Sequence, residues 1–253
     1  MSGRSLVKVI LLTQNENDLI EDFLLYWSAI FDPENVIVID NGSTSPRVLN
    51  AYAQHMSKGG SVVVDRRSFS QAAEFMTEHM KNLAESGSCD WIFPIETDEF
   101  IFYHPFVSES EGVNRRSVHE IREAIFAHLR NDIPSDVGVL KYGYFWGSSV
   151  DPADLTYSRG TYKRPAVNIT RFYDQGWDKV MVRSAAFDTM LQWCHIASTK
   201  PGFSTGVSMM LGLLHFHDGG KRRTVERAVP VVEGYGLVKV QNRTIDEQLL
   251  ETG

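Results

Sequence analysis

The sequence predicts an α/β fold, a single domain in which helices flank a mainly parallel central sheet, with a smaller antiparallel portion in the second half. Its 253 residues suit one large domain or two small ones. Hydrophobic residues make up 43% and charged residues 23% of the chain, which excludes disorder, collagen and coiled coil as the main description. The first hundred residues alternate short apolar runs with helical periodicity, and such alternation implies right-handed crossovers and a parallel sheet.

The first half contains four predicted strands. Val7–Thr13 is a β-branched and leucine-rich run typical of a buried strand. Residues 16–31 follow with apolar positions at helical spacing, so one face of that helix is expected to be buried. The other predicted elements are strands Asn35–Asp40, Ser61–Asp65 and Asp90–Ile95, a helix ending near Met56, and a helix over residues 69–83.

The second half is less regular. A helix is predicted over residues 117–130, a surface loop over Asp151–Pro165 and a short basic helix over Lys221–Val229. The predicted strands, some of them antiparallel, are Val137–Trp146, Val167–Phe172, Lys179–Arg183 and Leu211–His217. The sequence shows no repeat, low-complexity tract or clear linker, so one domain over residues 1–253 is the simplest organisation.

Charge and cysteine content narrow the function. The net charge of −7 (25 basic against 32 acidic residues) argues against a nucleic-acid partner, because proteins that coat nucleic acid are usually basic. Cys89 and Cys194 are the only cysteines, so no disulfide framework is expected and a reducing compartment fits. The apolar run Leu6–Thr13 is interrupted by Lys8 and is too short for a signal sequence or a membrane span. We therefore expect a cytoplasmic protein without a transmembrane segment.

Polar segments follow three of the predicted strands, and ligands of open parallel sheets bind at such strand ends. The segments are Thr13–Glu16, Asp40–Ser43 and Glu96–Glu99. None of them contains the Gly-x-Gly-x-x-Gly of a dinucleotide site, and the chain has no P-loop. If a nucleotide diphosphate binds here, a divalent cation held by carboxylates is the obvious means of neutralising it.

Glu96 and Asp98 supply a pair of carboxylates for such a cation. Residues i and i+2 at the end of an extended strand point to the same side, so both carboxylates could face one ion. The alternative, that Glu96, Asp98 and Glu99 form a solvated acidic loop, stays open on spacing alone.

The order of these segments resembles a known family. The segments Leu12–Glu16, Val38–Thr44 and Glu96–Phe100 are similar to the "NE", "xDNxST" and "DxDEF" motifs of GT-A-fold glycosyltransferases, more narrowly of the family 2-like and family 92-like enzymes. Two segments in the second half extend the match: Phe145–Ser149 resembles the "FGSS" segment, and Lys179–Arg183, with His195 after it, the "KxIxR" strand. The late "HY…K" element corresponds to Leu214–Phe216 with Lys221 and Arg227.

The resemblance covers roughly residues 6–228, and two residues depart from it. Glu96 stands where the metal motif begins with aspartate, which puts the geometry of metal binding in question. Phe216 stands in place of tyrosine, so a hydroxyl is lost.

The resemblance implies a metal-dependent, inverting hexosyl- or deoxyhexosyltransferase. Its donor would be a nucleotide-diphosphate sugar, UDP-linked as first choice and GDP-linked as second, bound with Mn²⁺ or Mg²⁺. Its acceptor would be a hydroxyl of a glycan, glycolipid or glycoprotein, which allows a peripheral position at a membrane. Residues 1–103 would form the nucleotide-sugar half, residues 104–230 the acceptor half and residues 231–253 a tail.

The same resemblance implies roles for individual residues. Thr13 with Asn15 or Glu16 would line the base pocket, and Asp40, followed by Asn41, would accept hydrogen bonds from base or ribose. Asp98, Glu96 and His215 would hold the cation, with His217 as the competitor of His215. Lys179, Lys221 and Arg183 would face the diphosphate or acceptor, and Asp151 or Glu99 would take the proton of the acceptor hydroxyl.

Each role has an ordinary structural alternative. Asp40 could simply start a turn, His215 could be a core histidine, and Asp151 could belong to a turn with Pro152. Lys179 and Arg183, as alternate residues of a strand, could be exposed.

Two other functions stay open, and a third is disfavoured. Glu96 motivates a non-catalytic relative that binds nucleotide sugar. A glycoside hydrolase would need two carboxyl groups at a defined separation, which neighbours on one strand end rarely provide. A nucleotidyltransferase would be expected to carry a glycine-rich turn after the first strand, and none occurs there.

Overall fold

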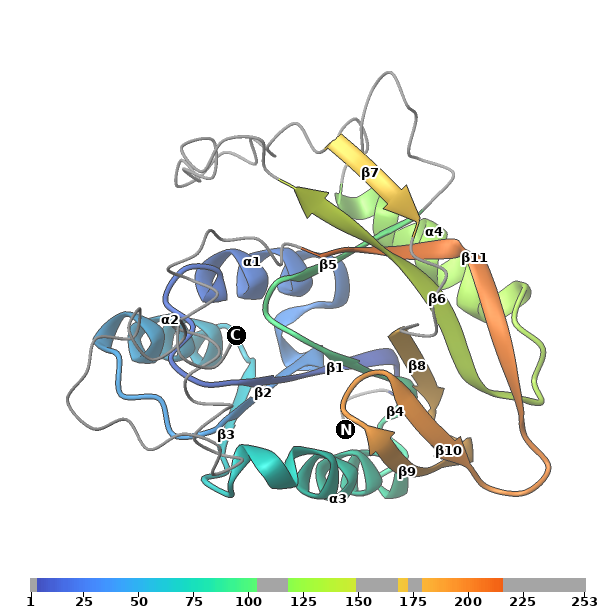
Figure 1. The fold of residues 1–253 in the computed structure, drawn as a ribbon, viewed down its shortest axis with the longest axis horizontal. Coiled ribbons are helices and arrows are strands. Elements are labelled where there is room, and N and C mark those ends of the chain that lie inside the picture. The colour runs from blue at the N-terminus through green and yellow to red at the C-terminus, as the bar shows by residue number, and fades with distance from the viewer. Residues whose placement is uncertain (1–3, 104–117, 149–167, 173–178, 216–253) are drawn as a thin grey trace, which may run out of the picture.

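The computed structural model describes residues 4–103, 118–148, 168–172 and 179–215. Their architecture is mixed α/β, built around one curled nine-stranded sheet and a separate two-stranded sheet (Figure 1). The predicted loop Asp151–Pro165 and the predicted helix Lys221–Val229 lie outside the described residues. None of the described helices has the length and apolar character needed to cross a membrane.

The helices are α1 (Ile20–Phe31), α2 (Pro46–Ser57), α3 (Ala72–Glu85) and α4 (Val118–Asn131). Strands of the first half are β1 (Ser5–Thr13), β2 (Val36–Asp40), β3 (Ser61–Val64), β4 (Cys89–Ile95) and β5 (Glu99–Tyr103). Strands of the second half are β6 (Val137–Ser148), β7 (Asn168–Phe172), β8 (Lys179–Arg183), β9 (Phe187–Gln192), β10 (Ile196–Thr199) and β11 (Ser204–His215).

The strand order of the large sheet is β3-β2-β1-β4-β8-β6-β11-β5, with β7 paired to β6. Strands β3, β2, β1 and β4 are mutually parallel, and β6 is parallel to β11. Strand β8 is antiparallel to both β4 and β6, so these two run in the same direction. The sheet is therefore mainly parallel, as predicted, and β9 with β10 forms the small antiparallel portion.

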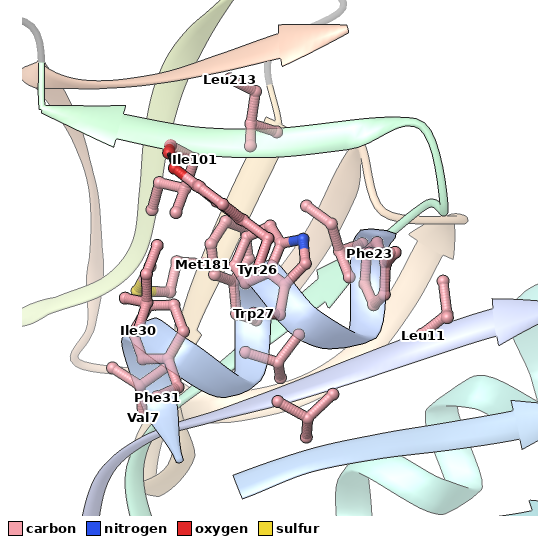
Figure 2. Packing of buried hydrophobic residues seen from close by; sticks show 14 of the residues in the cluster. Val7, Leu11, Phe23, Tyr26, Trp27, Ile30, Phe31, Ile101, Met181 and Leu213 are labelled. Carbon is pink, nitrogen blue, oxygen red and sulfur yellow. Dashed lines mark hydrogen bonds between the residues drawn. The ribbon is translucent and has the colours of Figure 1, made fainter. Parts of the chain in front are cut away.

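Helices α1, α2 and α4 cover one face of the sheet. The apolar face of α1 is buried against β1 and against β5, which lies over the helix because the sheet curls. Figure 2 shows Trp27 and Phe31 of α1 between Val7 of β1 and Ile101 of β5. The Trp27 ring stacks on Phe31 at 5.6 Å between centroids and meets Phe93 edge-on at 5.1 Å. Aromatic pairs in these geometries add to the stabilisation from burial alone.

The other face packs against α3 and the two-stranded sheet. Phe75, Met76 and Met80 of α3 meet residues of β1, β4 and β8 in a second buried cluster. Phe187 and Met190 of β9 belong to the same cluster, which explains why β9 lies beside α3 (Figure 1). This packing fixes the position of the turn between β9 and β10, which reaches the site described below.

The structure corrects several predicted elements. Helix α1 begins at Ile20 and not at residue 16, and the strand predicted to begin at Leu211 begins at Ser204 and is described as far as His215. Strands β5, β9 and β10 were not predicted. Strand β5 begins with an acidic residue, Glu99, and polar residues make up half of β9 and half of β10. Pairing with β11, and of β9 with β10, makes them strands in spite of that composition.

Candidate functional site

The polar strand ends meet at one edge of the sheet. Thr13, the last residue of β1, is in register with Asp40, the last residue of β2. The Thr97 hydroxyl, just after β4, donates a hydrogen bond of 3.2 Å to the Thr13 hydroxyl. Strands β6 and β11 end at the same edge, because they run parallel to β4. Strand β8 runs the opposite way, so its first residue, Lys179, is brought to this edge.

Asp40 holds the loop that follows β2. Its carboxylate accepts the backbone N–H of Ser43 at 3.0 Å and 3.1 Å, so the turn-starting role considered from the sequence is present. The Tyr52 hydroxyl donates to Asp40 Oδ1 over 3.2 Å. Burial is the main cause that raises the pKa of Tyr52 well above its usual range, so this hydroxyl keeps its proton. Gly42 has a φ of 87°, which a side chain would strain.

Asn15 and Asn41 join the loops of this edge. Asn15 Oδ1 accepts the backbone N–H groups of Thr44 at 2.8 Å and Ser45 at 3.0 Å, linking the ends of β1 and β2. Asn41 Nδ2 donates to the carbonyl oxygen of Asp65 over 2.6 Å, linking the ends of β2 and β3. Glu16 is nearly buried, and its carboxylate accepts the N–H of Asp18 at 3.3 Å. The predicted base-pocket residues therefore shape the edge of the sheet.

The acidic segment Glu96–Glu99 forms a tight turn between β4 and β5. The Glu99 N–H donates to the Glu96 carbonyl oxygen at 3.2 Å, and the Glu96 N–H donates to Glu99 Oε2 at 2.9 Å. The prediction that Glu96 and Asp98 continue an extended strand is wrong, because β4 ends at Ile95. The solvated-loop alternative is wrong as well, because Asp98 is 1% and Glu99 0% exposed.

Lys179 lies at the centre of a buried charged cluster. Its side chain is 1% exposed, so the expectation of an exposed strand residue is wrong. Its Nζ lies 2.6 Å from Glu99 Oε1 and 2.9 Å from Glu96 Oε2. The same ammonium lies 2.9 Å from Cys194 Sγ and 3.2 Å from His195 Nε2. One lysine thus joins the β4–β5 turn to the β9–β10 turn.

The protonation states of this cluster follow from burial and neighbouring charge. Burial opposes the charge of Lys179, but Glu99, then Cys194 and Glu96, outweigh it and raise the pKa of Lys179 well above its usual range. Burial, together with Glu96, raises the pKa of the Cys194 thiol well above its usual range against the opposing effect of Lys179. At neutral pH the cluster therefore contains an ammonium and a neutral thiol.

Cys194 and His195 were the residues of this cluster that sequence reasoning used least. Cys194 has a φ of 47°, and with this turn conformation it lies buried beside Lys179. Among the residues that the structure describes, Glu96, Cys194 and His195 form the group whose ligand atoms lie close enough to hold a metal ion, within 4.8 Å of one another. The adjacent cysteine and histidine were a signal in the sequence, since both are metal-ligand types.

Arg183 lies at the opposite end of β8 from Lys179. It pairs in register with Trp91 near the start of β4, and its guanidinium lies 4.3 Å from the centre of the Trp91 ring. Its Nε donates to the Val137 carbonyl oxygen at 2.9 Å. The expectation that Arg183 faces the diphosphate or acceptor is wrong, because an antiparallel strand carries its two ends to opposite edges of the sheet.

The structure describes the remaining predicted site residues in part or not at all. His215 pairs in register with Glu99 and Trp146, which brings its backbone to the acidic turn. Asp151, Lys221 and His217 lie outside the described residues.

The site and fold together define a class: an α/β protein with an acidic, lysine-linked site where the parallel strands end. Neither a protein-family model nor a curated protein matches the sequence. Solved structures to which the chain is similar include residues 1–349 of S. aureus TarS, with a TM-score of 0.46, 11% identity, and coverage of 90% of this chain and 65% of that one.

Two further structures carry enzyme names. Mannosyl-3-phosphoglycerate synthase from Rubrobacter xylanophilus has a TM-score of 0.42 and 13% identity, with 95% of this chain and 79% of that chain covered. Glucosyl-3-phosphoglycerate synthase from Mycobacterium tuberculosis, solved with Mn²⁺ and uridine-diphosphate-glucose, has a TM-score of 0.31 and 17% identity, with 55% and 44% covered. The matched part spans 28% of a longer S. aureus TarS structure and 44% of the M. tuberculosis enzyme.

Proposed function

We propose that the chain is a glycosyltransferase of the GT-A fold that takes its sugar from a nucleotide-diphosphate donor. The observation that carries the proposal is the meeting of Thr13, Asp40 and the Glu96–Glu99 turn at one edge of the sheet. These are the segments that the sequence resemblance names, and they lie where ligands of parallel sheets bind.

The charge of the acidic turn suits a divalent cation. Its three carboxylates, on Glu96, Asp98 and Glu99, carry three negative charges when ionised, and Lys179 brings one positive charge to them. A surplus of carboxylate charge favours hard cations such as Mn²⁺ or Mg²⁺. We propose that Asp98 and Glu96, with His215, hold this cation, which would stabilise the negative charge of the leaving diphosphate.

Donor and acceptor belong to the same proposal. Thr13, Asn15, Glu16, Asp40 and Asn41 would surround the nucleoside, a UDP-sugar being the first donor to test and a GDP-sugar the second. Lys221 would face the diphosphate. The acceptor would be a hydroxyl of a glycan, glycolipid or glycoprotein, the location cytoplasmic and the stereochemical outcome inversion.

A base is needed to take the proton of the acceptor hydroxyl. Glu99 is 0% exposed and its Oε1 lies 2.6 Å from Lys179 Nζ, so an acceptor proton would have to compete with the ammonium for this carboxylate. Of the two proposed bases, Asp151 is therefore the one to test by substitution.

The direct test measures the thermal midpoint with UDP, GDP, TDP and CDP, each with Mn²⁺ and with EDTA. A ligand that binds only the native state raises the midpoint, so one nucleotide should do so and lose its effect in EDTA. The Asp98→Asn variant should abolish the shift, while Glu85→Gln, on the exposed end of α3, should keep it. No shift with any nucleotide in the presence of Mn²⁺ would contradict the proposal.

A second candidate is a relative that binds nucleotide sugar without transferring it. The observation favouring it is that Glu96, which replaces the aspartate of the metal motif, is bound to Lys179. Nucleotide binding with Mn²⁺, but no loss of sugar from any donor, would support this candidate over the enzyme.

A further inference from the structure

Lys179 begins β8 at a polar edge of the sheet, yet its side chain is buried. It is among the largest fully buried side chains of the described residues. Burying an ammonium is costly unless charged and hydrogen-bonding partners surround it. The fold meets that cost with partners from two turns that are far apart in the sequence, and neither turn is held to the other by pairing of their own strands.

Each of the two turns provides two of these four partners of Lys179. Glu96 and Glu99 come from the β4–β5 turn, and Cys194 and His195 come from the β9–β10 turn. The second turn has its own anchorage, because Val180 N–H donates to the Cys194 carbonyl oxygen at 3.4 Å and Met190 of β9 packs in the core beneath. Lys179 therefore ties the acidic turn to a part of the molecule that the core already holds.

The distances favour an ammonium over a metal ion at this point. Lys179 Nζ lies 2.9 Å from both the nearest Glu96 oxygen and Cys194 Sγ, and 3.2 Å from His195 Nε2. Zinc bonds to the same ligand types are about 2.0–2.3 Å long. The ligand atoms of Glu96, Cys194 and His195 lie within 4.8 Å of one another around the ammonium, and a metal ion would have to compete with Lys179 for them.

We propose that Lys179 is a positioning residue: its buried ammonium fixes the Glu96–Glu99 turn against the Cys194–His195 turn, so that the acidic turn keeps its shape before a divalent cation and nucleotide arrive. This inference rests on the proposed function for its ligand and on the observed contacts for its geometry. A turn held in the binding conformation loses less entropy on binding, which raises affinity without adding a contact to the ligand.

The test separates positioning from folding by a paired substitution. Lys179→Met alone leaves the buried Glu99 carboxylate without its ammonium and can unfold the protein. The double variant Lys179→Met/Glu99→Gln removes both charges of the fully buried pair, and Glu96, the other carboxylate that contacts Lys179, is partly exposed to solvent. Lys179→Arg keeps the charge and tests rescue. Arg183→Met removes a cation from the other end of β8 and is the matched control.

Each variant is titrated with UDP in saturating Mn²⁺ by calorimetry, with circular dichroism to confirm the fold. We expect the double variant to remain folded and to bind Mn²⁺–UDP at least tenfold more weakly than the unmodified protein. Arg183→Met should bind normally, and Lys179→Arg should recover part of the loss. Unchanged affinity in the folded double variant would overturn the proposal and leave Lys179 a purely structural residue.

Two further measurements keep the inference separate from the proposed function. If the unmodified protein binds no nucleotide, the proposed function fails, and hydrogen exchange of residues 96–99 then decides the inference. Faster exchange there in the double variant, with no change in Arg183→Met, supports the anchor, and equal exchange overturns it. Tighter Zn²⁺ binding by Lys179→Met, measured with the metal alone, would also overturn it, because Lys179 would then be filling an ion site.

Discussion

The pair formed by Lys179 and Glu99 couples stability to the site. Both side chains are buried and their charged atoms lie 2.6 Å apart. Removing one partner of a buried ion pair leaves an uncompensated charge and costs about 3–5 kcal/mol, whereas replacing both partners is far less costly. We predict that Lys179→Met lowers the free energy of unfolding by about that amount and that adding Glu99→Gln restores most of it, as measured by urea denaturation.

Tyr142 provides the control for that experiment. It is in register with Lys179 on β6, it is buried, and among the described residues its hydroxyl has no hydrogen-bond partner. Tyr142→Phe should therefore leave stability unchanged or raise it slightly. A loss in Tyr142→Phe as large as in Lys179→Met would contradict the assignment of the effect to charge.

Asp65, after β3, gives a prediction of pH dependence. Arg67 donates to its carboxylate at 2.7 Å and 3.0 Å, and His79 lies 3.0 Å away. The hydrogen bonds from Arg67, with help from His79, hold the pKa of Asp65 well below its usual range. A carboxyl group whose pKa is lower in the folded state stabilises the fold above its unfolded pKa, and this contribution is lost as the pH falls below about 4.

We predict that Asp65→Asn lowers the free energy of unfolding by about 1–3 kcal/mol at pH 7 and flattens its decline between about pH 5 and pH 2. Urea denaturation at several pH values checks both parts. Asp90→Asn is the control, because its partner Arg4 forms a surface pair of the kind that contributes about 0–1 kcal/mol. Parallel curves for the unmodified protein and Asp65→Asn would contradict the prediction.

At the residue scale the sequence predicted which polar residues meet at one edge of the sheet but not the contacts of the candidate site. Thr13, Asp40 and Glu96–Glu99 were named because the ends of parallel strands share an edge, and they do meet there. The Lys179 cluster was not foreseen, since it depends on the position of the β9–β10 turn, which is set by packing against α3. Burial of a charged residue by distant partners leaves no local pattern in the sequence.

At the scale of elements, the joint between α4 and β11 shows how a strand irregularity is stabilised. The register of β11 against β6 shifts between Ser208 and Gly212. The Ser208 hydroxyl oxygen accepts the N–H groups of Met210 at 3.2 Å and Leu211 at 3.1 Å. It lies 2.8 Å from His128 Nε2 of α4. The serine thus satisfies the backbone of the bulge and joins it to the helix.

We predict that Ser208→Ala lowers the free energy of unfolding by about 1–3 kcal/mol, because buried N–H groups and a histidine nitrogen lose their partner. Ser204→Ala, at the exposed start of the same strand, should change it by less than about 0.5 kcal/mol. Thermal and urea denaturation give the two values, and equal effects at both positions would show that the bulge does not depend on Ser208.

The sequence predicted correctly those elements whose apolar residues form a continuous run or recur with a clear period. Helix α1 and strands β1, β2 and β4 bury a continuous or periodic apolar set, so their composition matches their environment. Strand β5 begins with Glu99, and half of the residues in β9 and in β10 are polar, without regular alternation. In these cases partners elsewhere in the chain decide the structure, and such partners cannot be identified from one sequence.

For the whole molecule, burial predicts an uneven stability. Strands β1 and β4 lie side by side in the middle of the sheet, and Val9, Ile10 and Phe93 are 0% exposed. Within the part of the chain that the structure describes, strand β3 pairs with β2 alone, and most of its residues are exposed. Local opening needs less free energy where few apolar contacts are broken.

We therefore predict that native-state hydrogen exchange is slowest for amides of β1 and β4 and faster by several orders of magnitude in β3. Mass spectrometry of peptides from the three strands measures the difference. Exchange of β3 as slow as that of β1 would mean that the sheet opens only as a whole.

Strand β8 has a consequence for the mechanics of the sheet. It connects the strands of the first half to β6 and β11, yet it pairs with β4 only at Trp91 and Ile92, whereas β1 and β4 pair along most of their length. Under a pulling force across the sheet, the load would be borne by the fewest hydrogen bonds at this seam. The sheet would yield there first and separate the strand ends of β1 and β2 from those of β6 and β11.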